Sequence, residues 1–287
     1  MRMNVNWNEK LALALMAMLL GAAATFAQAA QQKPPAQTPG DKPAQPQAAP
    51  LTLESTPPPV NAEEEAAYKA FHDAQPADAA KKDQLGEELL QKYPQSRYRS
   101  EIYNWQVKSF YSQNKIDKME IAGDKELELT PNDPQTLAIV GSALPRSMGP
   151  GTPDPQKRLA KAEQYCQKSL DLLATLVKPD GMTDEVFQQA KNQTSALAYG
   201  GLGLVAFRRG KYAEAIPDLE QALKLDPQPD PVNYYLLGVS SEKTSHFDDA
   251  VAAFTKCAAI PSGMQGACTQ DIEEAKKLAT TQLSAPK

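Results

Sequence analysis

The sequence predicts an all-α protein built as a solenoid of antiparallel helix hairpins. From Asn61 onward, apolar residues recur every three or four positions, and no stretch alternates with a period of two. This pattern indicates amphipathic helices without strands. A helix pair also recurs after 35 residues, because Tyr199 and Tyr234 head two similar segments. Recurrence at such a period indicates a repeat architecture in which successive units stack.

Residues 1–29 have the order of a secretory signal peptide. A charged stretch with Arg2 and Lys10 precedes an apolar run over residues 11–26, and Ala27-Gln28-Ala29 then forms a small-x-small cleavage site. A retained membrane anchor is the alternative, but this run of 16 residues is shorter than the roughly 20 that a span needs. We therefore expect cleavage, a mature chain without a membrane span, and export to a bacterial periplasm, with secretion as the alternative.

Residues 30–60 are rich in proline, glutamine and alanine. Such a composition buries little apolar surface and cannot offset the entropy cost of ordering, which predicts a disordered linker. The helical pattern begins directly after this segment. Residues 61–287 are therefore the predicted repeat domain.

The domain opens with a predicted hairpin. Asn61, with Glu64 three residues later, has the pattern of a capping box at the start of a helix. A second helix carries Leu85 and Leu89 on one face, and Pro94 ends it.

The clearest repeats span residues 196–227 and 231–261. Their shared positions, 35 residues apart, are Tyr199 and Tyr234, Leu202 and Leu237, Gly203 and Gly238, Ala215 and Ala250, and Leu219 and Phe254. Small residues at the contact let two helices approach closely, and large residues fill the remaining gaps. A proline after each unit ends its second helix.

This pattern resembles the tetratricopeptide repeat, with its large-x-x-Leu-Gly motif, its Ala-x-x-x-Phe motif and a terminal proline. Tyr199 and Tyr234 replace the usual tryptophan, and Pro217 falls inside a second helix. The resemblance implies a tetratricopeptide-repeat solenoid that binds proteins and is not an enzyme. Residues 92–96 also resemble helix ends in bacterial envelope members of the family, including outer-membrane assembly factors.

The remaining segments predict further units of the same kind. Residues 97–130 and 134–177 indicate two hairpins, and a Pro/Gly-rich insert over residues 145–155 separates the helices of the second. Residues 264–284 indicate a C-terminal capping helix. The sequence therefore predicts five hairpins and a cap.

Sequence motifs of catalysis are missing. The sequence has no Gly-x-Ser-x-Gly, His-Glu-x-x-His or phosphate loop, and neither His72 nor His246 has a cysteine or second histidine at ligand spacing. Gly201-x-Gly203-x-x-Ala206 mimics a dinucleotide fingerprint, but it neither follows a strand nor opens a helix. We expect no enzyme activity, no cofactor and no metal. The formal net charge of −5 without basic clusters also argues against nucleic acid.

The three cysteines have different predicted roles. Cys166 follows the spacing of Leu219, which indicates a buried core thiol. Cys257 and Cys268 are nearly equally far from the turn at residues 261–263, so they should lie opposite each other in an antiparallel pair. A disulfide can form there in an oxidising compartment, and two reduced core thiols are the alternative.

In such a solenoid, the first helices of successive hairpins line a concave groove. The predicted groove residues are Asn104, Trp105, Lys108, Tyr111, Leu204, Phe207, Arg208, Tyr235, Val239, Glu242 and Lys243. This mainly apolar set predicts binding of an extended or helical protein segment with apolar anchors. Alternatively, Leu204 and Tyr235 pack between repeats, and Trp105 is likewise either covered by neighbouring repeats or presented to a partner.

The predicted function is an exported, non-catalytic scaffold for protein–protein or protein–peptide interaction. The alternative is a structural or accessory subunit of a larger cell-envelope complex, for example in outer-membrane assembly.

Overall fold

A computed structural model of the chain describes residues 61–283, and the predicted signal peptide and linker lie outside this range. Within it the chain forms eleven helices and no strand, as predicted for an all-α protein. The described residues divide into two units at Tyr93 and Pro94.

The first unit is a hairpin of α2 (Ala62–Asp73) and α3 (Ala79–Lys92). The Asn61 side chain caps α2 by accepting hydrogen bonds from the backbone N–H groups of Glu63 and Glu64 at 3.0 and 3.4 Å. Phe71 is buried, and the Lys82 ammonium lies 4.9 Å from the centre of its ring. The predicted first hairpin is therefore present.

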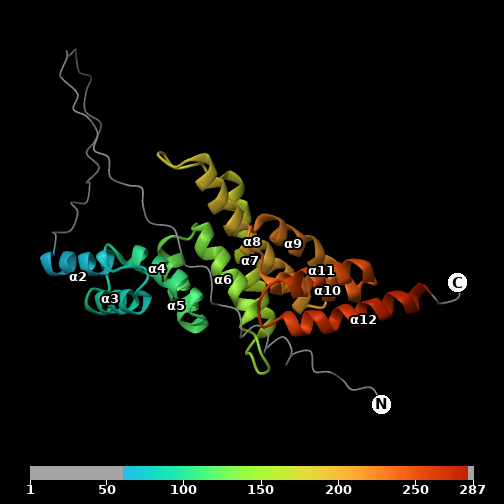
Figure 1. Cartoon of the computed structure of the whole chain (residues 1–287). Coiled ribbons are helices and arrows are strands. Elements are labelled where there is room, and N and C mark those ends of the chain that lie inside the picture. Colours follow the sequence, from blue (N-terminus) through green and yellow to red (C-terminus); the bar gives the residue numbers. More distant parts are fainter. Residues whose placement is uncertain (1–60, 284–287) are drawn as a thin grey trace, which may run out of the picture. The chain divides into compact units, whose positions relative to one another are not determined.

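The second unit contains four hairpins and a final helix (Figure 1). Its helices are α4 (Arg99–Ser112), α5 (Ile116–Leu129), α6 (Pro134–Arg146), α7 (Pro155–Thr175), α8 (Asp184–Arg208), α9 (Tyr212–Leu225), α10 (Pro231–Lys243), α11 (Phe247–Ala259) and α12 (Gln265–Leu283). The helix α12 packs on α11 as the predicted cap. The first helices also contact one another in order, α4 with α6, α6 with α8, and α8 with α10.

Three of these hairpins close with the same turn. Asn114, Gly210 and Ser245 occupy the turn with positive φ values of 56°, 74° and 64°. In each case the next backbone N–H donates to the carbonyl five residues earlier, at 2.8, 2.9 and 2.8 Å. This left-handed residue with its returning hydrogen bond is the usual way to end a helix and reverse the chain. The three repeats therefore also share the backbone conformation of the turn between their helices.

Gly203 and Gly238 mark the closest approach of two helices within a hairpin. A Cβ atom on Gly238 would lie 2.6 Å from ring atoms of Phe254, and one on Gly203 would lie 2.7 Å from the Leu219 side chain. Phe254 and Leu219 are fully buried. The large residue of the second helix thus occupies the space that each glycine leaves open.

The helix α8 is longer than the sequence analysis indicated. It begins at Asp184, whereas the repeat pattern began at residue 196. Residues 184–195 carry no continuous apolar stripe, so periodicity could not reveal them. A start signal was present, because Thr183 accepts a hydrogen bond from the backbone N–H of Val186 at 3.3 Å and acidic residues fill the first turn. The long helices α7 and α8 project together from the second unit (Figure 1).

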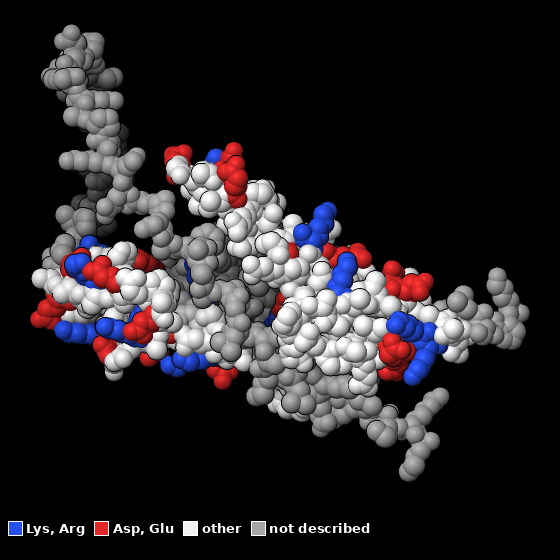
Figure 2. Space-filling model, in the orientation of Figure 1, with Lys and Arg blue, Asp and Glu red and all other residues white. Residues whose placement is uncertain are grey.

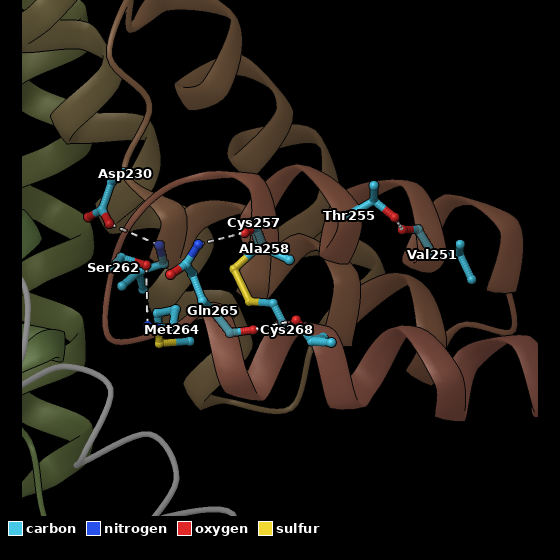
Figure 3. Close-up of a disulfide and its surroundings, with 11 residues drawn as sticks. Asp230, Val251, Thr255, Cys257, Ala258, Ser262, Met264, Gln265 and Cys268 are labelled. Atoms are coloured by element: carbon cyan, nitrogen blue, oxygen red, sulfur yellow. Dashed lines mark hydrogen bonds between the residues drawn. A yellow bond between two sulfur atoms is a disulfide. The ribbon is translucent and has the colours of Figure 1, made fainter.

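A disulfide joins Cys257 on α11 to Cys268 on α12, with the two Cα atoms 6.0 Å apart (Figure 3). Both cysteines are buried. Beside the bond, the Gln265 side chain donates to the carbonyl of Ala258 at 3.1 Å, which also holds the two helices together. Cys166 is a free, buried cysteine, and burial raises the pKa of its thiol. The cap is therefore attached both covalently and by packing.

We predict that Gly238→Ala destabilises the protein by about 1–3 kcal/mol, because the added methyl group overpacks the contact with Phe254. Gly266→Ala is the matched control, since a Cβ there meets nothing within 4 Å. This control should be neutral or stabilise the protein by up to about 1 kcal/mol. Urea unfolding followed by circular dichroism measures both. Equal stability of Gly238→Ala and the parent would show that the hairpin contact is assigned incorrectly.

Candidate protein-binding surface

The candidate surface lies on the first helices of the hairpins, α4, α6, α8 and α10, and we call it the first-helix face. It consists of the side chains that lie next to those through which these helices contact one another. Eight of the eleven predicted groove residues keep solvent-exposed surface. These are Asn104, Trp105, Lys108 and Tyr111 on α4, Phe207 and Arg208 on α8, and Glu242 and Lys243 on α10.

The other three predicted groove residues are buried, which corrects the expectation that they line an open surface. Leu204 belongs to a core cluster with Leu219 and residues of α10. Tyr235 and Val239 belong to another cluster, in which the rings of Tyr235 and Phe254 are 5.8 Å apart. These residues pack between successive helices, which is the alternative that the sequence left open. Helical spacing shows which side a residue lies on, but not which neighbour covers that side.

On α4, the predicted residue Asn104 has a hydrogen-bond partner within the fold, and Lys108 lies near two carboxylates. Asn104 donates a hydrogen bond to the Asp133 carboxylate at 3.0 Å. Asp133 in turn caps α6 by accepting from the backbone N–H groups of Gln135 and Thr136 at 3.1 and 3.2 Å. Burial lowers the pKa of Lys108, while the charges of Asp133 and Glu126 oppose that shift. This end of the surface is therefore held by structural contacts.

A basic residue ends each of the three consecutive first helices α6, α8 and α10: Arg146, Arg208 and Lys243. Each lies five residues after a glycine, namely Gly141, Gly203 and Gly238. Arg146 was not among the predicted residues, because the unit around Gly141 is degenerate. The shared spacing from the glycine was the available sequence signal. In the structure, Gly141 packs on Cys166 much as Gly203 packs on Leu219.

Arg146 forms an ion pair with Asp230 at 2.6 Å, and the two side chains are only 20% and 27% exposed. Asp230 also caps α10 by accepting from the backbone N–H of Val232 at 2.9 Å. Burial by itself would lower the pKa of Arg146. The charges of Asp230 and of the nearby Tyr111 outweigh burial, so the pKa of Arg146 is raised. The pair joins the end of α6 to the start of α10.

Arg208 differs from the other two basic residues. Among the described residues, no carboxylate lies within ion-pair distance of it, and its buried Nε atom has no hydrogen-bond partner. Burial alone lowers the pKa of Arg208. Lys243, by comparison, lies 3.7 Å from the Glu242 carboxylate. Arg208 is therefore the basic residue of this surface best placed to receive an anionic group from a partner.

Residues 61–281 include no group of three or more His, Cys, Asp and Glu side chains that could hold a metal ion. None of the helices described is both long and apolar enough to span a bilayer.

Comparison with known proteins identifies the repeat. The tetratricopeptide repeat profile matches residues 196–229. No curated protein matches the sequence. Among solved structures, PilW, a type IV pilus biogenesis factor, is similar with a TM-score of 0.50 and 15% identity, over 77% of this chain and 91% of that one. A tetratricopeptide-repeat protein of Thermus thermophilus has a TM-score of 0.45 and 16% identity, over 74% of this chain and 98% of that one.

We predict that Asp230→Asn destabilises the protein by about 1–3 kcal/mol, because it leaves Arg146 largely buried without its counter-charge. Asparagine is as good a helix cap as aspartate, so the substitution isolates the ion pair from the cap. Asp248→Asn, at the exposed start of α11, is the control and should change stability by less than about 0.5 kcal/mol. A double-mutant cycle with Arg146→Gln measures the coupling by urea unfolding. Strictly additive effects would mean that the pair contributes no interaction energy.

Proposed function

Because this chain is a tetratricopeptide-repeat protein, we propose that it is an exported, non-catalytic scaffold that binds another protein on the first-helix face. The repeat fold is an interaction scaffold, since stacked repeats create an extended binding surface. The observation that carries the proposal is Arg208, a half-buried guanidinium without a carboxylate partner among the described residues.

Arg208 and the aromatic residues of the first-helix face indicate what the partner offers. A desolvated charge without a counter-charge costs free energy, and a carboxylate on the partner would remove that cost. Phe207 lies beside it and packs edge-on against Tyr212 at 5.3 Å, while Trp105 and Tyr111 keep exposed surface on α4. Partly exposed aromatic residues and arginine are the types that dominate binding energy at interfaces. We therefore infer that the partner segment carries apolar anchors and an acidic residue.

Export is the second part of the proposal. It is supported by the signal-peptide pattern of residues 1–29, and the Cys257–Cys268 disulfide suits an oxidising compartment such as the periplasm.

A second candidate is an accessory subunit of a larger cell-envelope complex. PilW, which shares the fold, is a pilus biogenesis factor. An accessory subunit would co-purify from the envelope in fixed stoichiometry with the other subunits. A receptor for a protein segment would instead bind that segment reversibly by itself.

We predict that a photo-crosslinking amino acid at Phe207 captures a discrete protein partner in the native cell envelope. The same group at Ile121, which is exposed on α5, is the matched control and should capture little. Arg208→Glu should lower the affinity for the captured partner at least about tenfold, or about 1.4 kcal/mol, because it places like charges together. Lys211→Glu, at the exposed turn, should change it less than about twofold. Capture from Ile121 but not from Phe207 would place binding outside the first-helix face.

We also predict that mass spectrometry of the chain from the envelope fraction finds Ala30 as the first residue. Alkylation without reductant should label Cys257 and Cys268 only after the protein is reduced. Expression of residues 30–287 in the cytoplasm is the control, where reducing conditions should leave both thiols free. A chain that retains Met1 would contradict cleavage and indicate an anchored protein. Free thiols at Cys257 and Cys268 in envelope material would show that the disulfide does not form.

A further inference from the structure

The connection between α7 and α8 carries an apolar surface that the repeat does not use. Of the six large apolar side chains that are exposed in the described part of the chain, four lie in residues 176–186, which we call the knob. They are Leu176, Val177, Met182 and Val186, and Val177 is 82% exposed. Concentrated apolar exposure of this kind marks an interaction site.

The knob is held in a defined conformation by local interactions. The backbone N–H of Met182 donates to the carbonyl of Pro179 at 3.3 Å across a turn in which Gly181 has a φ of 82°. Lys178 forms an ion pair with Asp184, and Thr183 caps α8. The apolar side chains are therefore presented by an ordered loop, which lowers the entropy cost of binding.

The helices that carry the knob are longer than a repeat requires. The helices α7 and α8 have 21 and 25 residues, whereas α10 and α11 have 13 each. The additional 12 residues of α8 extend it by roughly 18 Å. The knob thus stands at the end of a projection (Figure 1).

A groove of about 460 Å³ lies between α9 and α11, with α10 as its floor, and we call it the α9–α11 groove. Its apolar lining includes Ile216, Leu223, Tyr234 and Leu237, all partly exposed. The volume is within the range of pockets that bind a few apolar groups. Its floor belongs to the first helix α10, but none of the eleven predicted first-helix residues lines this groove, so it is a separate surface.

The knob and the groove carry side chains of opposite charge that form no ion pair within the described part of the chain. Asp180 and Glu185 form no ion pair among the described residues, whereas Asp184 pairs with Lys178. Figure 2 shows acidic side chains at the end of the projection. The groove presents Lys224 and Lys256, which also form no ion pair in the part of the chain described, and Lys256 lies 5.8 Å from the Tyr234 ring. Glu220 and Asp249 share the rim, so apolar contact supplies most of the affinity and the lysines orient the knob.

We propose that the knob of one copy of this chain docks in the α9–α11 groove of a second copy. The knob stands apart from the groove of its own chain, because the continuous helix α8 carries it roughly 18 Å beyond the length of the repeat helix α10. The contact joins two different surfaces, so it is head-to-tail and builds open chains or closed rings of copies. The inference goes beyond the proposed function, since the first-helix face stays free in each copy.

The test is sedimentation velocity of residues 30–287 with the disulfide intact, over a range of protein concentrations. The parent protein should associate, and association should weaken as salt rises because the opposite charges are screened. Val177→Asp in the knob and Ala252→Glu in the groove should each raise the dissociation constant at least tenfold. Both positions are exposed, so the variants should fold, which circular dichroism checks. Ile121→Asp, at an exposed apolar position on α5, is the control and should associate like the parent.

A mixture of the two variants separates this contact from any other. The Val177→Asp chain retains an intact groove, and the Ala252→Glu chain retains an intact knob. Mixed, they should form a one-to-one pair that does not grow further, although each alone is monomeric. A parent that stays monomeric, variants that associate like the parent, or variants that fail to pair when mixed would each overturn the proposal. Flotation of the parent, but not of Val177→Asp, with phosphatidylcholine vesicles would assign the knob to a membrane and also overturn it.

Discussion

The close contact between a glycine on the first helix and a large side chain on the second, present in the α8–α9 and α10–α11 hairpins, is the interaction on which the rest of the second unit depends. Gly238 leaves room for Phe254, and Gly203 leaves room for Leu219. This fit sets the distance between the two helices, and repeating it sets the position of each hairpin against the next. The turns with a left-handed residue then close three of the hairpins in the same way.

Regular stacking places equivalent residues in equivalent positions, but their chemistry depends on their neighbours. Arg146, Arg208 and Lys243 follow their glycines at the same spacing. Arg146 pairs with Asp230, which lies two hairpins further along, while Arg208 has no such partner among the described residues. An unpaired, desolvated guanidinium is unfavourable unless a partner supplies the anion. The departure from the common pattern is therefore what distinguishes a candidate binding residue from a structural one.

The irregular parts of the chain carry the other distinctive features. The helices α7 and α8 are longer than the other helices of their unit, and they place an ordered apolar loop at their end. The disulfide at Cys257 and Cys268 ties the cap to the last hairpin. A repeat fold supplies a general binding shape that many proteins share, so specificity has to come from features such as these.

The sequence by itself determined the helical class, the five hairpins with their cap, the helix-packing glycines and the juxtaposition of Cys257 and Cys268. Each of these depends on spacing along the chain, which periodicity and a 35-residue recurrence report directly. Only the tertiary structure decided that Leu204 and Tyr235 are buried, that Arg146 pairs with Asp230 across 84 residues, and where α8 begins. A helical pattern shows which face of a helix is apolar, but the neighbour that covers a face, or leaves it open, comes from elsewhere in the chain.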